Sequence, residues 1–204
     1  MTVDPKKSYH HGNLKEKLIE ASAKAIAESG IETLSLRKVA DGAGVSHNAP
    51  YMHFKDKEAL LAAVAEAGFL KLTDNLQAVV NSHADKPWKA QYFSGCLCYV
   101  EFALANKGYV QSMFRRYDQA RFPALRQTSI TSIQSLVDVL REGQHTGHVK
   151  DGDLQPMVGA TWTILHGLAM LLLHRDDIPA VLGHHKVKPL VESSLSQLLD
   201  GLQA

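Results

Sequence analysis

The sequence has 204 residues, of which 45% are hydrophobic and 21% are charged, and its formal net charge is +1. This length and apolar content suit one or two folded domains and exclude a wholly disordered chain. The near balance of charges excludes a histone-like polybasic protein, although a local basic patch is compatible with nucleic-acid binding. The two cysteines, Cys96 and Cys98, are too few for a disulfide framework and favour a reducing cytoplasm.

The chain begins with a polar, basic segment over 1–12, which lacks the apolar stretch of a secretory signal. Hydrophobic residues then recur at helical spacing from about residue 14, which predicts a first helix. Asn13 with Glu16 resembles a capping box at its start, and Gly30 is a natural end. Basic and histidine side chains here suit either contacts with a DNA minor groove or phosphates, or a solvated tail; they are Lys6, Lys7, His10, His11, Lys15 and Lys17.

Two short helices and one long helix are predicted next. The first starts after Ser35 and stops at Gly44, and the second runs from the capping residue Ser46 to about residue 54. Asp56 is the predicted cap of the long helix, which extends from about 57 to 81.

The rest of the chain is also helical in pattern, with breakers such as Pro87, Pro123 and the glycines of 143–152 between the segments. The predicted helices lie near 88–106, 108–117, 122–143, 154–174 and 186–203. No strand alternation is found, so the predicted fold class is all-α with about nine helices. We expect an N-terminal arm and three-helix domain over 1–57 and a larger helical domain over 58–204.

One of these segments, Met157 to Leu173, contains no Asp, Glu, Lys or Arg. It is shorter than the ~20 apolar residues that a membrane span needs, and His166 would lie near its middle. This pattern favours a buried or subunit-interface helix in a soluble protein over a membrane span.

The short helices around Gly44-Val45 are typical of a helix-turn-helix, because a tight turn with glycine lets the second helix cross the first. The second helix of such a pair lies in the DNA major groove and presents its first residues to base edges, here Ser46, His47 and Asn48. Tyr51, His53 and Lys57 follow at the same end and are able to donate to phosphates. The alternative is that 46–54 is a short connector, and spacing alone leaves both interpretations open.

The segment from Thr33 to Leu61 resembles the DNA-binding domain of the TetR family of transcriptional repressors. The resemblance extends over about 10–72, roughly the first third of the chain. The matching positions are Ser35, Arg37, Val39-Ala40, the turn Ala43-Gly44-Val45-Ser46, Tyr51, His53-Phe54, Lys57-Glu58 and Leu60, together with Glu28-Ser29-Gly30-Ile31 at the end of the first helix.

The resemblance implies a role for each matched polar residue. It assigns phosphate contacts to Ser35, Tyr51, His53 and Lys57, and it makes Arg37, His47 and Asn48 the candidates for base contacts. Arginine on guanine and asparagine on adenine are common bidentate contacts, each worth ~1–3 kcal/mol of discrimination. Pro50 departs from the family pattern, since many members carry an apolar residue there, and proline removes an N–H that would bond back to Ser46.

Nine of the 14 aromatic residues fall between 88 and 122. Most are expected to pack in the core, but ligand cavities between helices are also lined by aromatic and apolar groups. Trp162, His166 and Gly167 resemble the Trp-x-x-x-His-Gly signature of one C-terminal subclass of the TetR family, and a packing role is favoured for His166. The candidate lining residues are Tyr92, Tyr99, Tyr109, Met113, Tyr117, Trp162 and His166.

The resemblance also implies a homodimer. The family builds a two-fold, four-helix interface from the positions of 154–174 and 186–203. The apolar circumference of Met157 to Leu173 independently favours coverage by a second subunit. Two recognition helices would then meet a pseudo-palindromic operator at half-sites ~34–36 Å apart.

Other chemistry is weakly supported. His145-x-x-His148 and His184-His185 lie in connectors without further ligands at zinc-site spacing, so solvated histidines are the favoured interpretation. Cys96-x-Cys98 is not the C-x-x-C redox spacing, and on a helix these side chains point about 200° apart. No nucleotide-binding loop or metalloprotease motif is found. We therefore expect no metal, no cofactor and no enzymatic activity.

The sequence thus predicts a cytoplasmic, ligand-responsive transcriptional regulator, a repressor that an unknown small molecule releases from operator DNA. Two alternatives stay open. One is a redox- or metal-sensing regulator on the same scaffold. The other is an all-α small-molecule-binding protein or enzyme with an incidental helix-turn-helix.

Overall fold

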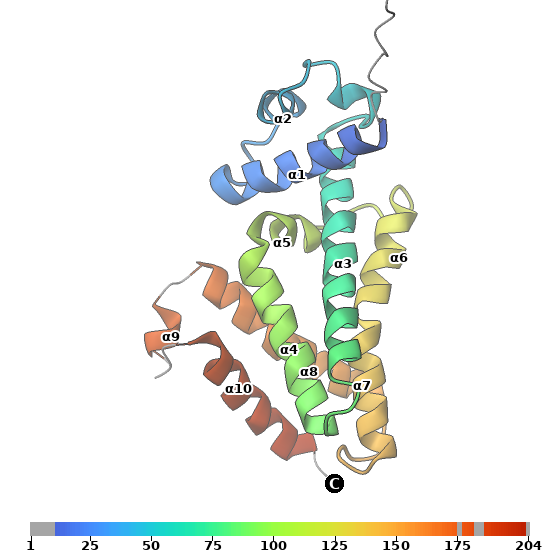
Figure 1. Ribbon diagram of the computed structural model, residues 1–204, viewed down its shortest axis with the longest axis vertical. Helices are drawn as coiled ribbons and strands as arrows, with labels where there is room; N and C mark the ends of the chain where they lie inside the picture. The colour runs from blue at the N-terminus through green and yellow to red at the C-terminus, as the bar shows by residue number, and fades with distance from the viewer. Residues whose placement is uncertain (1–10, 175–176, 182–185, 203–204) are drawn as a thin grey trace, which may run out of the picture.

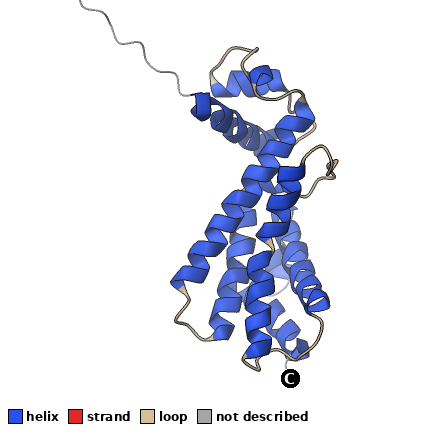
Figure 2. Ribbon diagram, turned by 90° about the vertical axis from the view of Figure 1, so that its right-hand side faces the viewer, coloured by secondary structure: helices blue, strands red, loops and turns tan. Residues whose placement is uncertain are grey.

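The computed structural model describes residues 11–174, 177–181 and 186–202. Within these ranges every regular element is helical, which confirms the all-α prediction (Figure 2). A small helical unit lies at one end of an elongated molecule, and a larger helical bundle forms the remainder (Figure 1).

The small unit contains α1 (His11–Ser29), α2 (Leu36–Ala43) and the 3-10 helix η1 (Pro50–Met52). Their ends follow the predicted signals. Ser35 accepts a hydrogen bond from Lys38 N at 3.2 Å, and Gly44 adopts the left-handed conformation (φ 67°) that ends α2. Leucine, isoleucine, valine and phenylalanine side chains from α1, α2 and the start of the next helix form a compact core of their own.

The bundle is organised around the long helix α3 (Lys57–Ser82), which runs from the small unit to the far end of the molecule (Figure 1). Asp56 caps it as predicted, since its Oδ1 accepts from Ala59 N at 2.9 Å. The other helices are α4 (Trp88–Ala105), α5 (Lys107–Met113), α6 (Pro123–Ser132), α7 (Gln134–His145), α8 (Leu154–His174), α9 (Ile178–Val181) and α10 (Val187–Leu202).

The predicted third helix over 46–54 is wrong in type, because this segment forms turns and a short 3-10 helix. Most of its backbone bonds span three residues, as in Ala49 N to Ser46 O (2.9 Å) and Met52 N to Ala49 O (3.2 Å). Pro50 has no N–H with which to make the four-residue bond to Ser46. Pro50 is therefore consistent with a 3-10 helix in place of the predicted α-helix.

The single helix predicted over 122–143 is also wrong, since the chain breaks at Ile133 into α6 and α7. Hydroxyl groups before the break bond back to carbonyl oxygens of the preceding turn, as Thr128 Oγ1 does to Ala124 O (2.8 Å) and Thr131 Oγ1 to Gln127 O (3.1 Å). Such bonds compete with the backbone ladder and bend helices.

Three smaller boundaries also differ from the prediction. The helix α1 begins at His11, so Asn13 lies inside it and does not cap it. The helix predicted over 108–117 ends at Met113. The predicted connector around Pro179 contains the short helix α9, where a proline in the first turn costs no hydrogen bond.

The apolar helix α8 is long enough and apolar enough to cross a membrane by length and composition. One of its faces packs in the main core with α4, α7 and α10, through Met157, Thr161, Leu165, Leu168 and Leu172. The opposite face is exposed and carries Gly159, Thr163, Gly167 and Leu171. The helix is therefore a core helix with one uncovered stripe.

Candidate nucleic-acid interface and ligand cavity

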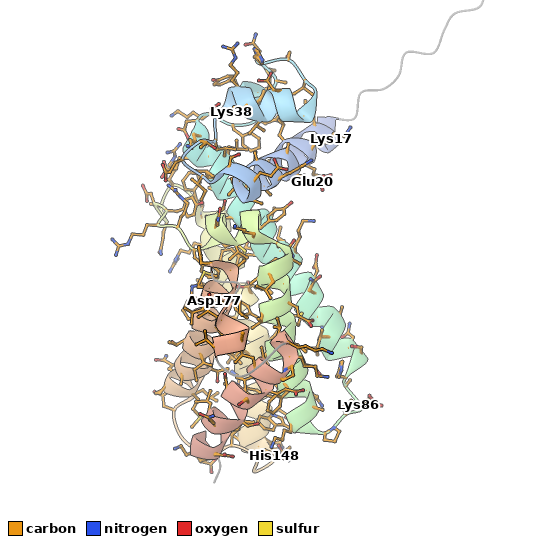
Figure 3. All side chains as sticks on the ribbon, turned by 90° about the vertical axis from the view of Figure 1, so that its left-hand side faces the viewer. Lys17, Glu20, Lys38, Lys86, His148 and Asp177 are labelled. Carbon is orange, nitrogen blue, oxygen red and sulfur yellow. The ribbon has the colours of Figure 1, made fainter. Side chains whose placement is uncertain are left out.

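The end of the molecule formed by α2 and η1 exposes several large side chains. Tyr51 is 60% exposed and Met52 is 83% exposed, and Arg37 is also exposed. Lys38 on α2 marks this end, and His148 marks the opposite end of the molecule (Figure 3). Sequence reasoning missed Met52, although an apolar residue beside Tyr51 on such a short polar segment is itself a signal for an interface.

The remaining predicted DNA-binding residues lie around the same turn, and two of them are tethered. His47 Nε2 lies 2.6 Å from Asp41 Oδ1, which holds the imidazole against α2. Lys57 Nζ donates to Glu32 O at 3.2 Å. Ser46 and Asn48 are exposed without such tethers, whereas Ser35 and His53 are half-buried. The structure thus brings all eight predicted residues to one end of the protein.

The start of α3 is joined to the loop before α6 by Arg121, which sequence reasoning missed. Arg121 Nη2 lies 2.6 Å from Asp56 Oδ2, and Nη1 contacts Glu58 Oε2. The hydrogen bond from Ala59 N and the guanidinium of Arg121 lower the pKa of Asp56 below its ordinary 3.8. Because these partners are more than 60 residues apart, no local sequence pattern indicates the contact.

We expect Asp56→Ala to lower the melting temperature, because it removes the cap of α3 and one partner of Arg121. The pKa of Asp56 is lowered on folding, so its stabilising contribution is fully present above pH 3.8 and is lost as the pH falls through the folded pKa. Thermal unfolding should show a difference between the two proteins that is constant from about pH 7 to 5 and shrinks below about pH 4. A difference that stays undiminished at about pH 2.5 would contradict this role.

The small unit is also joined to the bundle by α5. Gly108 packs so closely on α1 that a Cβ in its place would lie 1.8 Å from Ala23 O. The Tyr117 hydroxyl group lies 3.2 Å from Leu61 O in α3 and 3.0 Å from Ser112 O in α5. The rings of Tyr109 and Tyr117 pack against the cores of both units. These contacts connect the bundle to α1 and to the start of α3.

The bundle contains a cavity of about 620 Å³, partly open to solvent, between α3, α4, α6, α7 and α8. Of the predicted ligand-binding residues, Tyr92, Tyr99 and Trp162 line it. Met113 and Tyr117 line a second cavity of about 110 Å³. Tyr109 and His166 are among the lining residues of neither.

His166 lies behind the cavity wall and supports it. Its Nδ1 lies 2.9 Å from the Tyr99 hydroxyl, and its ring stacks on Trp162 at 5.1 Å between centroids. Burial lowers the pKa of His166, which favours the neutral imidazole that such packing needs. These contacts give His166 the packing role that the sequence favoured, and they orient two rings of the lining.

The cysteines and histidines considered for redox or metal chemistry lie in separate surroundings. Burial raises the pKa of Cys96 to about 12 and also raises that of Cys98, so both are held as thiols, the less reactive form. Among the described residues, no three His, Cys, Asp or Glu side chains are grouped to hold a metal ion. His148 stacks on Trp88 at 5.3 Å. His184 and His185 lie outside the described residues.

A helix-turn-helix unit packed on an all-α bundle is typical of DNA-binding transcriptional regulators. Residues 18–64 match the family described as bacterial regulatory proteins, tetR family, and residues 93–182 match the tetracyclin repressor-like C-terminal domain. The chain belongs to the TetR family and is a DNA-binding transcriptional regulator, not an enzyme.

Relatives and solved structures agree with this assignment. The chain is 29% identical over 136 residues to the HTH-type transcriptional repressor KstR2 of Mycobacterium tuberculosis, covering 65% of this chain and 68% of that one. Across the curated relatives, the matched part spans from 26% to 80% of their own lengths. A structure from Rhodococcus sp. RHA1, described as of unknown function, is 30% identical with a TM-score of 0.82, covering 98% and 100% of the two chains. The regulator FadR from Bacillus subtilis in complex with stearoyl-CoA shares the fold at 19% identity, with a TM-score of 0.74 over 92% and 99% of the chains.

Proposed function

We propose that this protein is a cytoplasmic repressor that binds a pseudo-palindromic operator as a homodimer and leaves it when a small molecule fills the 620 Å³ cavity. Arg37, His47 and Asn48 read base edges, and Ser46 is presented to the bases beside them. Phosphates are bound by Ser35, Tyr51, His53 and Lys57. Domain 1–57 reads DNA, and domain 58–204 binds the ligand and the second subunit. The exposure of Arg37 and Tyr51 at the free end supports this division.

The observation that carries the release mechanism is the connection from the cavity wall to the DNA-reading unit. Ser129 and Ile130 of α6 line the cavity. The chain just before α6 holds Arg121, which pairs with Asp56 at the start of α3. A ligand that displaces α6 therefore moves the segment that follows η1. Release requires that the ligand bind the DNA-incompetent arrangement more tightly, since equal binding shifts nothing.

Two relatives support parts of the proposal. KstR2 is described as a repressor, and the FadR structure contains stearoyl-CoA. A repressor that responds to a small molecule therefore fits proteins of this fold. The aromatic and apolar lining of the cavity also suits an organic ligand more than an inorganic ion.

A homodimer through α8 and α10 is supported by the uncovered stripe of α8. The exposed residues of this stripe follow one another at intervals of four, so they share one face of the helix. They are Gly159, Thr163, Gly167 and Leu171. Leu171 is 49% exposed there. Two copies of this stripe related by a two-fold axis would cover each other and would place two recognition segments on one side.

We expect Gly167→Glu to yield a monomer with weakened operator binding. A Cβ at Gly167 meets no atom within 4 Å, so the subunit itself tolerates the change. In the dimer, however, the new carboxylate would be buried at the interface without a partner, which destabilises the dimer. Loss of the second half-site should reduce operator affinity by at least about 100-fold. Sedimentation equilibrium and operator titration measure both effects, with Thr131→Glu on exposed α6 as the control. A Gly167→Glu protein that remains dimeric would show that the interface lies elsewhere.

Transcription from the promoter nearest the protein's own gene tests the repressor role. In a purified transcription reaction, adding the protein should lower transcript yield, and a footprint should show two related half-sites. Increased transcript would instead identify an activator. If the protein gave no footprint and no change in transcript at that promoter, control of its own locus would be contradicted.

A further inference from the structure

The 620 Å³ cavity is elongated along α3 and differs in chemistry between its two ends. Its lining on α3 runs from Phe69 to His83, about 21 Å at 1.5 Å per residue. The helices α6 and α7 line it over a similar length, from Ser129 to Glu142. They run beside α3 from the DNA-reading end to the far end of the bundle (Figure 1).

The end nearer the DNA-reading unit is aromatic. Phe69 and Phe114 meet edge to face with centroids 6.0 Å apart, and Phe114 lies 6.1 Å from Trp162. Tyr99 completes this part of the lining. Aromatic faces bind apolar groups and also attract organic cations, through the negative potential of the ring face.

The far end is acidic. Asp138 and Glu142 lie one turn apart on α7, and both line the cavity. Arg141 pairs with Asp138 at 2.6 Å, whereas Glu142 has no ion-pair partner among the described residues. Among the described lining residues none is Lys or Arg. Both carboxylates are exposed at this end, and Asp138 is already paired, so an anionic ligand would meet the unpaired Glu142 and no lining countercharge.

The other titratable lining groups do not reverse this charge. Burial raises the pKa of Tyr92 and Tyr99 and raises that of Cys96 to about 12, so these groups stay neutral. The remaining one is His83, whose Nδ1 lies 3.1 Å from Val79 O. Glu142 is thus the lining charge that is free to meet a ligand.

We propose that the ligand is a lipophilic cation: an amine or quaternary ammonium group at the Glu142 end, attached to an apolar chain or ring system that lies against Phe69, Phe114 and Trp162. This assignment rests on the proposed function, since it names the ligand class of the same cavity. It separates this protein from a relative such as FadR, whose structure contains the anionic stearoyl-CoA.

Calorimetry with three probes of equal chain length tests the ligand class on the full-length protein. The probes are decyltrimethylammonium, decanol and decanoate, each below its micelle concentration. We expect the cation to bind at least tenfold more tightly than decanoate, with decanol between them. Decanoate binding as tightly as the cation, or no saturable binding of the cation, would overturn the proposal.

Glu142→Gln tests the position of the cation. We expect a severalfold loss of affinity for decyltrimethylammonium and little change for decanol, because the variant removes charge and keeps shape. Glu101→Gln, an exposed residue of α4 outside the lining, should change neither. Unchanged cation affinity in Glu142→Gln would overturn the assignment.

Operator release, measured with the same probes, separates this proposal from the proposed function. If decanoate binds best and releases DNA, the cation assignment is wrong and the release mechanism stands. If the cation binds with the expected preference and the operator stays bound, the ligand class stands and its role in release is wrong.

Discussion

Replacing Arg37 by Ala is expected to abolish specific operator binding at concentrations where the unchanged protein is saturated. A bidentate arginine–guanine contact is worth ~1–3 kcal/mol, and a dimer makes it twice. The expected loss is therefore ~2–6 kcal/mol, which is roughly 30-fold to 2 × 10⁴-fold in affinity at about 1.4 kcal/mol per factor of ten. Arg37 is exposed on α2, so its replacement should leave folding intact.

The measurement is an operator titration by fluorescence anisotropy, with a control at another arginine. Arg116→Ala removes an equal charge from the exposed loop between α5 and α6 and should bind DNA nearly as tightly as the unchanged protein. A base contact also predicts relaxed preference at one symmetric pair of operator positions. If Arg37→Ala bound the operator as tightly as Arg116→Ala does, Arg37 would not be part of the DNA interface.

The second large effect is expected at Gly108, where α5 packs on α1. A Cβ there would lie 1.8 Å from Ala23 O, 2.7 Å from Ala23 C and 3.1 Å from Ala27 N. All three atoms are backbone, so no side-chain rotation relieves the clash and one helix must move. We expect Gly108→Ala to cost ~1–3 kcal/mol or more, as overpacking does, and to lower the melting temperature by several degrees.

Gly95→Ala is the matched control for stability. Gly95 lies within α4, and a Cβ there meets nothing within 4 Å. Alanine is the better helix former, so this variant should gain up to about 1 kcal/mol. If the two variants melted at the same temperature, the close contact between α1 and α5 would not be stabilising the fold.

The parts of the fold that depend on local chemistry were predictable from the sequence. Ser35 and Asp56 cap their helices because a short polar side chain reaches the N–H three residues ahead, and glycine ends α2 because it adopts positive φ freely. The turn between α2 and η1 was predictable for the same reason. Pro50 indicated altered geometry at this position, but the sequence did not indicate a 3-10 helix there.

The cavity and its connections were only partly predictable, because they depend on which helices become neighbours. Trp162 and His166 share one face of α8, yet Trp162 lines the cavity and His166 packs behind it against Tyr99. The carboxylates Asp138 and Glu142 had no distinguishing pattern on an amphipathic helix. Arg121 pairs with α3 across more than 60 residues, which no local periodicity indicates.

The most direct measurement is the salt dependence of affinity for DNA flanking the protein's own gene, for the unchanged protein and Lys57→Ala. For the unchanged dimer, log Kobs should fall linearly with log salt, with a slope of about −0.9 for each phosphate neutralised. Removing one lysine per subunit should make that slope shallower by about 2, and affinity should fall across all sequences alike. An affinity that does not change with salt, or a slope that Lys57→Ala leaves unaltered, would contradict phosphate binding through this helix-turn-helix.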